Sequence, residues 1–374
     1  MVVIVTNIPT PYRIPLFNSV SALLAAHSQT LHVVFAMRKY SRRRWVDVLD
    51  RARFEYTVLD TPRFEAGFEQ VFFVPRGIKA TLDKLHPECI VVSGFNLMAV
   101  AAARYASNRR IPYVVWSGET IDQFRQRSLR YLRTLTRRKL VGNAAAFISY
   151  GRRASEYLES LGVGKNRIHV AVNTVDTDVF LRASDSLPKN DGSLRLLYVG
   201  HLQERKGLQY VLKAMEKLRD IPVSLDVVGS GPMQPVYQRY TEDHGLTNVV
   251  FHGFKQQDDL TQYYPASDIF LFPSTSELFG LVMVEAAASG LPIIASKLAG
   301  GTVDIVQDGV NGYVVDPTNV DELTGKIRDL WSYPEKRKAM GAASRQIVRD
   351  SVNIHRSAQG FVDGVMAGLA DKPG

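Results

Sequence analysis

The chain of 374 residues carries a net charge of +9, and 45% of its residues are hydrophobic. This length suits two globular domains, and no apolar run approaches the roughly 20 residues that a membrane-spanning helix needs. The single cysteine, Cys89, excludes an internal disulfide, and Met1 leads directly into an apolar run without a signal peptide, so the expected location is a reducing cytoplasm.

The basic surplus lies in the first half of the chain. Residues 1–182 contain 27 Lys and Arg against 14 Asp and Glu, whereas the remainder contains 19 against 23. A basic half joined to a mildly acidic half predicts different partners for the two. For the basic half the candidates are an anionic membrane surface, a phosphorylated acceptor or nucleic acid.

Short apolar runs followed by turns mark the first half as a series of strands. Arg13 follows the first run in a loop with three prolines, and Asn96 follows another. Ser117 and Glu119 follow a later one. Ligands of doubly wound sheets bind beyond the carboxyl ends of strands, so these side chains are candidates for a binding site. Arg13 either faces an anionic acceptor or is an ordinary loop cation. The predicted strands cover residues 2–6, 31–36, 90–93, 113–116 and 147–150.

Residues 125–141 form a predicted basic amphipathic helix. At 100° per residue, four leucines share one face and five arginines share the other. Such a helix either packs on the domain as a surface helix or also docks on anionic lipid head groups or a pyrophosphate-lipid acceptor. The two sets are Leu129, Leu132, Leu135 and Leu140, and Arg127, Arg130, Arg133, Arg137 and Arg138.

A polar segment rich in turn formers, residues 183–193, is the predicted interdomain linker. The strand predicted at 194–199 then leads into Gly200, His201, Arg205 and Lys206 before a helix. Glycine with paired cations between a strand and a helix is typical of a loop that binds phosphate.

Two later strands also end in turns at glycine. Gly229 follows the strand at 223–228, and Gly253 with Phe254 follows the strand at 249–252. The first turn has the form Gly-x-Gly directly after a strand, and its register indicates that it approaches the same ligand.

Residues 268–296 read as a strand, a polar turn with Glu277, a helix that opens near Gly280 and contains Glu285, and a second strand. The helix N-terminus at Phe279, Gly280 and Leu281 offers backbone N–H groups and the positive end of the helix dipole to a phosphate. Glu277 would reach a hydroxylated group on one side of that phosphate, and Glu285 would reach hydroxyls on the other. Two sugars joined by a diphosphate fit such a site.

The same stretch follows the pattern P-S-x-x-E-x-F-G-L-x-x-x-E-A-x-A-x-G-x-P, in which seven residues separate the two acids. This pattern resembles the signature of the family-four glycosyltransferases of the GT-B fold. The resemblance is specific over residues 194–330 and loose in the first half. It implies an α/β protein with two Rossmann-like domains that have parallel sheets and face each other across a cleft. The domains would be 1–182 and 194–350, and a C-terminal helix within 351–374 would cross back to the first.

The resemblance also implies roles for single residues. Glu277 would contact the transferred sugar, and Glu285 would contact the ribose of the donor. Lys206 would neutralise the diphosphate, and the second cation would be Arg205 or His201, since histidine replaces the usual arginine. The donor-binding set is Gly200, His201, Gly229, Phe254, Phe279, Gly280, Leu281 and Glu285.

On the acceptor side, the family often has a histidine or an acid after the fourth predicted strand. Ser117 and Glu119 stand there, and Glu119 would either orient or deprotonate an acceptor hydroxyl or make a structural hydrogen bond. Arg13 and Asn96 complete the acceptor side. The catalytic set is therefore Lys206, Arg205, Glu277 and Glu119.

The predicted reaction moves a sugar from a nucleotide-diphosphate sugar to a hydroxyl of a glycan or lipid-linked glycan. The sequence leaves the base of the donor open, and UDP and GDP are among the candidates. The resemblance implies retention of configuration and a role in cell-surface polysaccharide biosynthesis, including lipopolysaccharide. No D-x-D motif is present, so we expect neither a metal nor another cofactor. Peripheral contact with the cytoplasmic face of the inner membrane would run through residues 125–141.

Three other classes compete with this prediction. A catalytically silent nucleotide-sugar-binding subunit would have the same fold. A nucleic-acid-binding protein would use the arginine-rich helix, but we expect no nucleic acid partner. A dinucleotide oxidoreductase is disfavoured because the first strand lacks a G-x-G-x-x-G turn.

Overall fold

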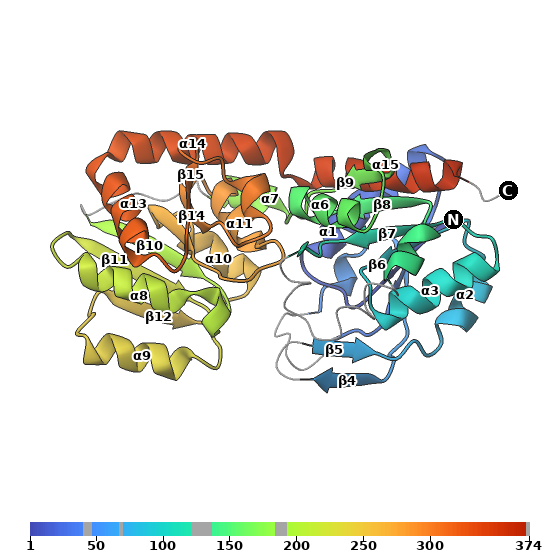
Figure 1. Ribbon diagram of the computed structural model, residues 1–374, viewed down its shortest axis with the longest axis horizontal. Helices are drawn as coiled ribbons and strands as arrows, with labels where there is room; N and C mark the ends of the chain where they lie inside the picture. Colours follow the sequence, from blue (N-terminus) through green and yellow to red (C-terminus); the bar gives the residue numbers. More distant parts are fainter. Residues whose placement is uncertain (40–46, 67–69, 122–136, 184–192, 372–374) are drawn as a thin grey trace. The chain divides into compact units, whose positions relative to one another are not determined.

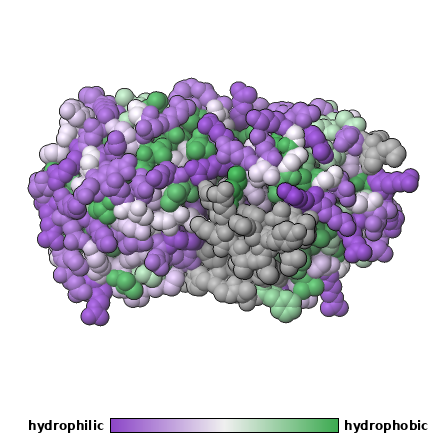
Figure 2. Space-filling model, in the orientation of Figure 1, coloured by the Kyte–Doolittle hydropathy of each residue, from purple (hydrophilic) through white to green (hydrophobic). Residues whose placement is uncertain are grey.

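The computed structural model describes residues 1–39, 47–66, 70–121, 137–183 and 193–371 (Figure 1). By its internal contacts the chain divides into two compact units. Unit 1 comprises Met1–Asn173 and Ile354–Gly374, and unit 2 comprises Thr174–Asn353. On the face shown in Figure 2, the described surface is mainly hydrophilic with scattered apolar side chains, as expected when the apolar residues fill internal cores.

Unit 1 is built on a sheet of seven parallel strands in the order β3-β2-β1-β6-β7-β8-β9. Alternate residues of the central strands enter two separate hydrophobic cores, since neighbouring side chains of a strand point to opposite faces. The strands are β1 (Val2–Thr6), β2 (Leu31–Phe35), β3 (Glu55–Val58), β6 (Cys89–Ser93), β7 (Tyr113–Ser117), β8 (Ala146–Ser149) and β9 (Ile168–Val170).

Helices cover both faces of this sheet. One core contains side chains of α1 and α15, and the other contains side chains of α2 and α3. A separate antiparallel hairpin joins β4 (Arg63–Ala66) to β5 (Gln70–Phe73). Residues 122–136, most of the predicted amphipathic helix, lie outside the described residues. The helices are α1 (Arg13–Ala26), α2 (Ile78–Leu85), α3 (Leu97–Asn108), α6 (Arg152–Ser160) and α15 (Ile354–Ala370).

Unit 2 has a second parallel sheet, with the order β12-β11-β10-β13-β14-β15. The chain runs outward from β10 to β12 on one side and then from β13 to β15 on the other. The strand order therefore reverses between β10 and β13, and in doubly wound sheets this point marks the edge at which ligands bind. The strands are β10 (Leu194–Val199), β11 (Val223–Val228), β12 (Val249–Gly253), β13 (Ile269–Phe272), β14 (Ile293–Ser296) and β15 (Gly312–Val315).

The helices of unit 2 include one that the sequence analysis placed in the first domain. The predicted boundary lies at residue 182, whereas the structure assigns α7 (Thr177–Ala183) to unit 2, where it packs against α10 and α11. Residues 184–192 of the predicted linker lie outside the described residues. The other helices are α8 (Leu208–Lys217), α9 (Gln234–Asp243), α10 (Gln257–Tyr263), α11 (Leu281–Ala288), α12 (Thr302–Ile305), α13 (Val320–Ser332) and α14 (Pro334–Ser351).

Both units have a parallel, helix-covered sheet, which confirms the predicted class of two Rossmann-like domains. After α14, the chain enters unit 1 again as α15, which packs against α1, β8 and β9. Of the helices that the structure describes, none is both long and apolar enough to span a membrane.

The contact of α15 with β9 gives a first testable prediction. A Cβ at Gly360 would lie 2.0 Å from the carbonyl oxygen of Val170, whereas a Cβ at Gly325 of α13 would meet nothing within 4 Å. We expect Gly360→Ala to lower the free energy of unfolding by about 1–3 kcal/mol through overpacking. Gly325→Ala should raise it by about 0.5–1 kcal/mol through helix propensity alone.

Urea unfolding followed by circular dichroism measures both variants. Because each exchange replaces a helical glycine with alanine, the difference between them isolates the clash. Equal stability of the two variants would contradict the close packing of α15 on β9.

Candidate functional site

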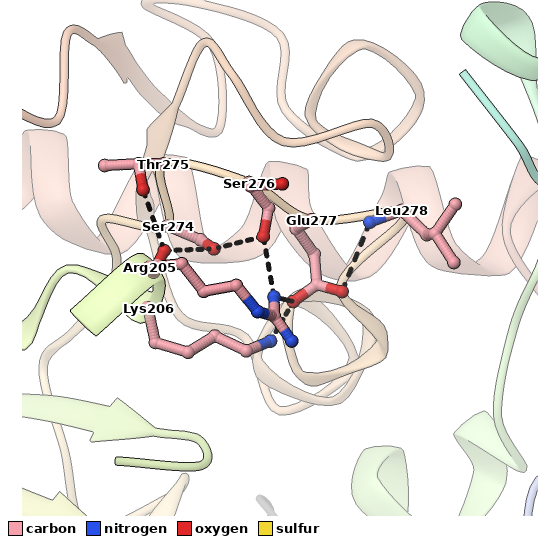
Figure 3. A network of polar contacts seen from close by, with 7 residues as sticks. All are labelled: Arg205, Lys206, Ser274, Thr275, Ser276, Glu277 and Leu278. Atoms are coloured by element: carbon pink, nitrogen blue, oxygen red, sulfur yellow. Dashed lines mark hydrogen bonds and ion pairs between the residues drawn. The ribbon is translucent and has the colours of Figure 1, made fainter. Parts of the chain in front are cut away.

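Two loops meet at the carboxyl edge of the unit 2 sheet, one following β10 and one following β13. The Arg205 carbonyl oxygen accepts hydrogen bonds from Thr275 N at 2.8 Å and from the hydroxyls of Ser274 and Thr275, each at 3.1 Å (Figure 3). Gly207 has a φ of +76°, and a Cβ there would lie 2.1 Å from the Pro273 carbonyl oxygen. Only glycine allows this approach, so local backbone chemistry brings the two loops together.

Glu277 lies between two cations of the β10 loop. Lys206 Nζ donates to Glu277 Oε2, and Arg205 Nη1 lies 3.9 Å from the same oxygen (Figure 3). Arg205 Nη1 also donates to the Ser276 carbonyl oxygen at 2.7 Å, and Leu278 N lies 3.2 Å from Glu277 Oε1. The structure therefore brings together three of the four residues predicted to be catalytic.

The charge of Glu277 is set by these neighbours. Burial alone would raise the pKa of its carboxyl, but Lys206 and Arg205 outweigh burial and leave the pKa below the ordinary value of 4.5. The side chains of Lys206 and Glu277 are only 16% and 17% exposed. Glu277 is thus a carboxylate at neutral pH, and it holds both cations at the edge of the sheet.

The N-terminus of α11 follows this network directly. Gly280 precedes the helix with a φ of +96°, and no side chain caps the helix. A third loop, which follows β14, holds the segment between Glu277 and the start of α11. Gly300 N donates to the Glu277 carbonyl oxygen and Gly301 N donates to the Phe279 carbonyl oxygen, each at 3.0 Å. Phe279 is buried and Leu281 is the first residue of the helix. The predicted phosphate seat therefore lies next to Glu277 along the chain.

Glu285, the second acid, is buried within α11 and only 6% exposed. Its Oε2 accepts a hydrogen bond of 2.6 Å from the Tyr264 hydroxyl. Burial raises the pKa of Glu285 to about 7, although the hydrogen bond from Tyr264 acts in the opposite direction. The sequence analysis did not name Tyr264, because no spacing in the sequence pairs a residue after α10 with one in α11.

The remaining residues of the predicted donor set lie at the same edge of the sheet. Gly229 has a φ of +142°, and a Cβ there would lie 1.8 Å from the Gly200 carbonyl oxygen. Gly229 N donates to the Gly253 carbonyl oxygen at 2.8 Å. Phe254 is 37% exposed just beyond β12, and His201 is exposed just beyond β10.

In unit 1, the predicted acceptor residues are engaged in local contacts. Arg13 donates to Thr6 Oγ1 at 2.6 Å and to the Tyr150 hydroxyl at 3.0 Å, and its guanidinium lies 4.9 Å from the ring centroid of Trp116. Asn96 Oδ1 caps α3 by accepting from Ala99 N at 2.9 Å.

Ser117 and Glu119 lie at the end of β7. Ser117 is 1% exposed, and its Oγ accepts a hydrogen bond from Glu119 N at 3.2 Å. The Glu119 carboxylate forms an ion pair of 2.6 Å with Arg137. The structure thus gives Glu119 a structural role with a specific partner, Arg137, which the spacing in the sequence does not reveal.

The prediction that Arg137 belongs to the polar face of a surface helix is wrong. Arg137 is 6% exposed, and its guanidinium lies 5.0 Å from the Phe95 ring centroid and 5.7 Å from that of Tyr157. Burial is possible because Glu119 supplies the counter-charge and the two rings contact the guanidinium face. Periodicity alone cannot detect such partners.

Among the described residues, no group of three or more His, Cys, Asp or Glu side chains is placed to hold a metal ion. The geometry of unit 2 instead combines two cations, a helix N-terminus and two acids. Cations and helix N-termini bind anions, and carboxylates accept hydrogen bonds from hydroxyls. A ligand with a phosphate group flanked by hydroxylated groups suits this arrangement.

Two family models match successive parts of the chain. Residues 19–179 match the model described as Glycosyltransferase Family 4, and residues 180–347 match the model described as Glycosyl transferases group 1. The second match contains every predicted donor residue from Gly200 to Glu285.

Curated relatives align over part of their length. The chain is 33% identical over 215 residues to a D-inositol 3-phosphate glycosyltransferase of Paenarthrobacter aurescens, covering 54% of this chain and 51% of that protein. It is 34% identical over 169 residues to O-antigen chain mannosyltransferase C of Escherichia coli, covering 45% of each. A GDP-mannose-dependent alpha-(1-6)-phosphatidylinositol monomannoside mannosyltransferase of Mycolicibacterium smegmatis is 31% identical over 237 residues, 59% of this chain and 61% of that protein. The chain spans about half the length of the curated relatives it matches.

Solved structures share the fold over nearly the whole chain. Alr3699/HepE of Anabaena, solved in complex with UDP, has a TM-score of 0.77 at 18% identity, covering 98% of this chain and 99% of that one. A sucrose-phosphate synthase of Thermosynechococcus elongatus has a TM-score of 0.73 at 18% identity, covering 97% and 98%. At these identities the likeness shows the fold alone.

The pairing of Lys206 with the half-buried Glu277 gives a second prediction. We expect Lys206→Met to lower the free energy of unfolding at pH 7 by about 1–3 kcal/mol, because the carboxylate loses its closest cation. A carboxyl whose pKa is lower in the folded than in the unfolded protein stabilises the folded state at pH values above the unfolded pKa. This stabilisation is lost as the pH falls through the folded pKa. The difference in free energy of unfolding between the wild type and Lys206→Met should therefore shrink below about pH 4.5.

Chemical denaturation at pH 7 and pH 4 measures the effect. Lys338→Met is the matched control, because Lys338 pairs with Glu335 on the exposed surface of α14, where such pairs contribute about 0–1 kcal/mol. The double variant Lys206→Met/Glu277→Gln should recover most of the loss. A Lys206→Met protein as stable as Lys338→Met would show that the network does not hold the two loops.

Proposed function

Because the chain belongs to the family-four glycosyltransferases of the GT-B type, we propose that it transfers a sugar from a nucleotide-diphosphate sugar to a hydroxyl of a glycan or lipid-linked glycan. One observation carries the proposal. Lys206 and Arg205 meet Glu277 beside the N-terminus of α11, at the point where the strand order of unit 2 reverses.

The leaving diphosphate gains negative charge as its bond to the sugar breaks. Groups that are already oriented toward this charge stabilise the transition state without reorganising. Lys206 has three N–H donors, so it can keep Glu277 and donate to a phosphate oxygen at the same time. Arg205 and the amides that open α11 would complete the binding of the diphosphate.

The two acids would bind the two sugars of the donor. Glu277, ionised and held by two cations, would accept hydrogen bonds from hydroxyls of the transferred sugar. Glu285, one helical turn or more further along α11, would accept from the ribose hydroxyls. Gly229 packs its backbone directly on that of Gly200. The turns at Gly200, Gly229 and Gly253 would present backbone groups to the donor, and Phe254 would flank the base.

We propose that transfer retains the anomeric configuration. A mechanism with two carboxylates needs one acid of raised pKa beside a nucleophile, both at the scissile bond. The lowered pKa of Glu277 makes it a poor proton donor, and Glu285 is buried against Tyr264. Attack of the acceptor on the face of the leaving diphosphate, with a phosphate oxygen as base, fits this environment better.

The acceptor would bind to unit 1, through Arg13, Asn96 and Ser117, with Glu119 orienting its hydroxyl. The basic surplus of residues 1–182 supports an anionic or lipid-linked acceptor, and two relatives carry names with phosphorylated inositol acceptors. UDP and GDP both remain candidates for the donor nucleotide. Membrane contact through residues 125–141 and a cytoplasmic location stay predictions.

A catalytically silent nucleotide-sugar-binding subunit is the second candidate. This candidate is favoured by His201, an exposed residue that occupies the position of an arginine in the family motif, because the site would then lack the cation that this arginine supplies. Transfer by the purified protein, or hydrolysis of the donor, distinguishes an enzyme from a silent subunit.

A third prediction tests the donor site. Isothermal titration of UDP- and GDP-sugars should show binding of one class to the wild type. We expect Lys206→Met/Glu277→Gln to bind it at least about tenfold more weakly, because a hydrogen bond to a charged group contributes about 1.5–3 kcal/mol. The double variant removes the cation without leaving a half-buried unpaired carboxylate, so the loss reports on binding rather than folding.

Lys338→Met is again the matched control, and its affinity should equal that of the wild type. Unchanged affinity in the double variant would refute the assignment of Lys206 to the diphosphate. For the reaction, NMR of the product formed from an α-linked donor should show an α-linkage at early times, and a β-linkage would refute retention.

A further inference from the structure

Tyr264 is a buried tyrosine whose hydroxyl has a defined position. The residue follows α10 directly and is 0% exposed. Its ring contacts Phe180 edge to face at 5.6 Å and Phe270 at 5.8 Å, measured between centroids. Side chains of α7 and β13 thus hold the ring, and its hydroxyl donates to Glu285 Oε2 on α11. Three elements therefore fix the place of this hydroxyl.

The hydrogen bond leaves one oxygen of Glu285 available. Within the described chain, Oε1 of Glu285 has no hydrogen-bond partner, and it is not sealed from solvent. The carboxyl can turn about its last bond only by breaking the 2.6 Å bond from Tyr264. The Tyr264 hydroxyl therefore restricts Glu285 to an orientation in which one oxygen is held by the protein and the other is free for a ligand.

We propose that Tyr264 is the positioning residue of the donor site: it holds Glu285 Oε2 so that Oε1 accepts from the donor's ribose. This inference rests on the proposed function and deepens it. Tyr264 itself contacts no substrate, because its ring is enclosed and its hydroxyl points to the carboxyl. The shared contact of α7, α10 and α11 around Tyr264 then serves binding as well as stability.

The hydroxyl also acts on the ionisation of Glu285. Burial raises the pKa of this carboxyl to about 7, and the Tyr264 hydrogen bond favours its ionised form. Charged residues on the elements that pack against α11 do not contribute to the shift. The charged residues on these elements are Asp178 and Arg182 on α7, Asp304 on α12, and Glu335, Lys336, Arg337, Lys338, Arg345, Arg349 and Asp350 on α14.

Removal of the hydroxyl should therefore weaken donor binding in a pH-dependent way. An ionised carboxylate accepts hydrogen bonds from two hydroxyls, whereas a protonated one is a weaker acceptor. Without Tyr264 the carboxyl should ionise at a higher pH than in the wild type. The loss of affinity should be largest near pH 7 and smaller at pH 9, where Glu285 is ionised in both proteins.

The experiment compares wild type with Tyr264→Phe, using UDP and GDP as probes and isothermal titration between pH 6 and pH 9. We expect about tenfold weaker binding at pH 7, the effect of losing one hydrogen bond to a charged group. In steady-state transfer assays, KM for the donor should rise while kcat changes little, since the lost contact is present before and during transfer.

Tyr113→Phe is the matched control. Tyr113 is equally buried, and its hydroxyl donates to the Leu140 carbonyl oxygen in unit 1 at 2.5 Å. Both variants lose one buried hydroxyl, so both should lose some thermal stability, but only Tyr264→Phe should change nucleotide affinity and its pH profile. NMR of carbon-13-labelled glutamate carboxyls, assigned with Glu285→Gln, should show a higher titration midpoint for Glu285 in Tyr264→Phe.

The outcomes separate the two claims. If the wild type binds a nucleotide and Tyr264→Phe matches it in affinity, pH profile and carboxyl midpoint, the positioning role is refuted and the proposed function stands. If the wild type binds neither nucleotide, UDP- and GDP-sugars are refuted as donors, and the role of Tyr264 in binding them is refuted with it.

Discussion

The candidate site depends on the ion pairs that Lys206 and Arg205 form with the half-buried carboxylate of Glu277. These ion pairs join a loop after β10 to a loop after β13, and these loops are neighbours only because the strand order reverses between the two strands. Gly207 makes the approach possible, since a Cβ there would collide with the Pro273 carbonyl. Topology brings the loops together, and the ion pairs then orient the cations that the proposed diphosphate requires.

The two acids of the signature have the same chemistry and opposite environments. The pKa of Glu277 is lowered because the effect of two cations outweighs the effect of burial. The pKa of Glu285 is raised because burial is opposed only by the hydrogen bond from the neutral Tyr264 hydroxyl. One acid is therefore a permanent charge at neutral pH, and the other lies close to its midpoint. This difference supports separate roles on the two sides of a diphosphate, and it explains why Tyr264 matters to only one of them.

Two arginines of unit 1 are held by internal partners. Arg137 is enclosed by Glu119, Phe95 and Tyr157, and Arg13 is held by Thr6 and Tyr150 beside Trp116. Charges of this kind stabilise the loops after the strands rather than forming a basic surface.

Local pattern alone determined five strands of each sheet, the glycine turns after them and the place of Glu277 and Glu285 on either side of the start of a helix, but it missed β3, β9 and β15. These follow from periodicity and turn chemistry, which act over a few residues. Tertiary structure decided the rest. It placed α7 with unit 2, buried Arg137 against Glu119, and set Tyr264 on Glu285, 21 residues away in sequence. Burial and partnership depend on which segments the fold brings together, and no short-range signal in the chain records that.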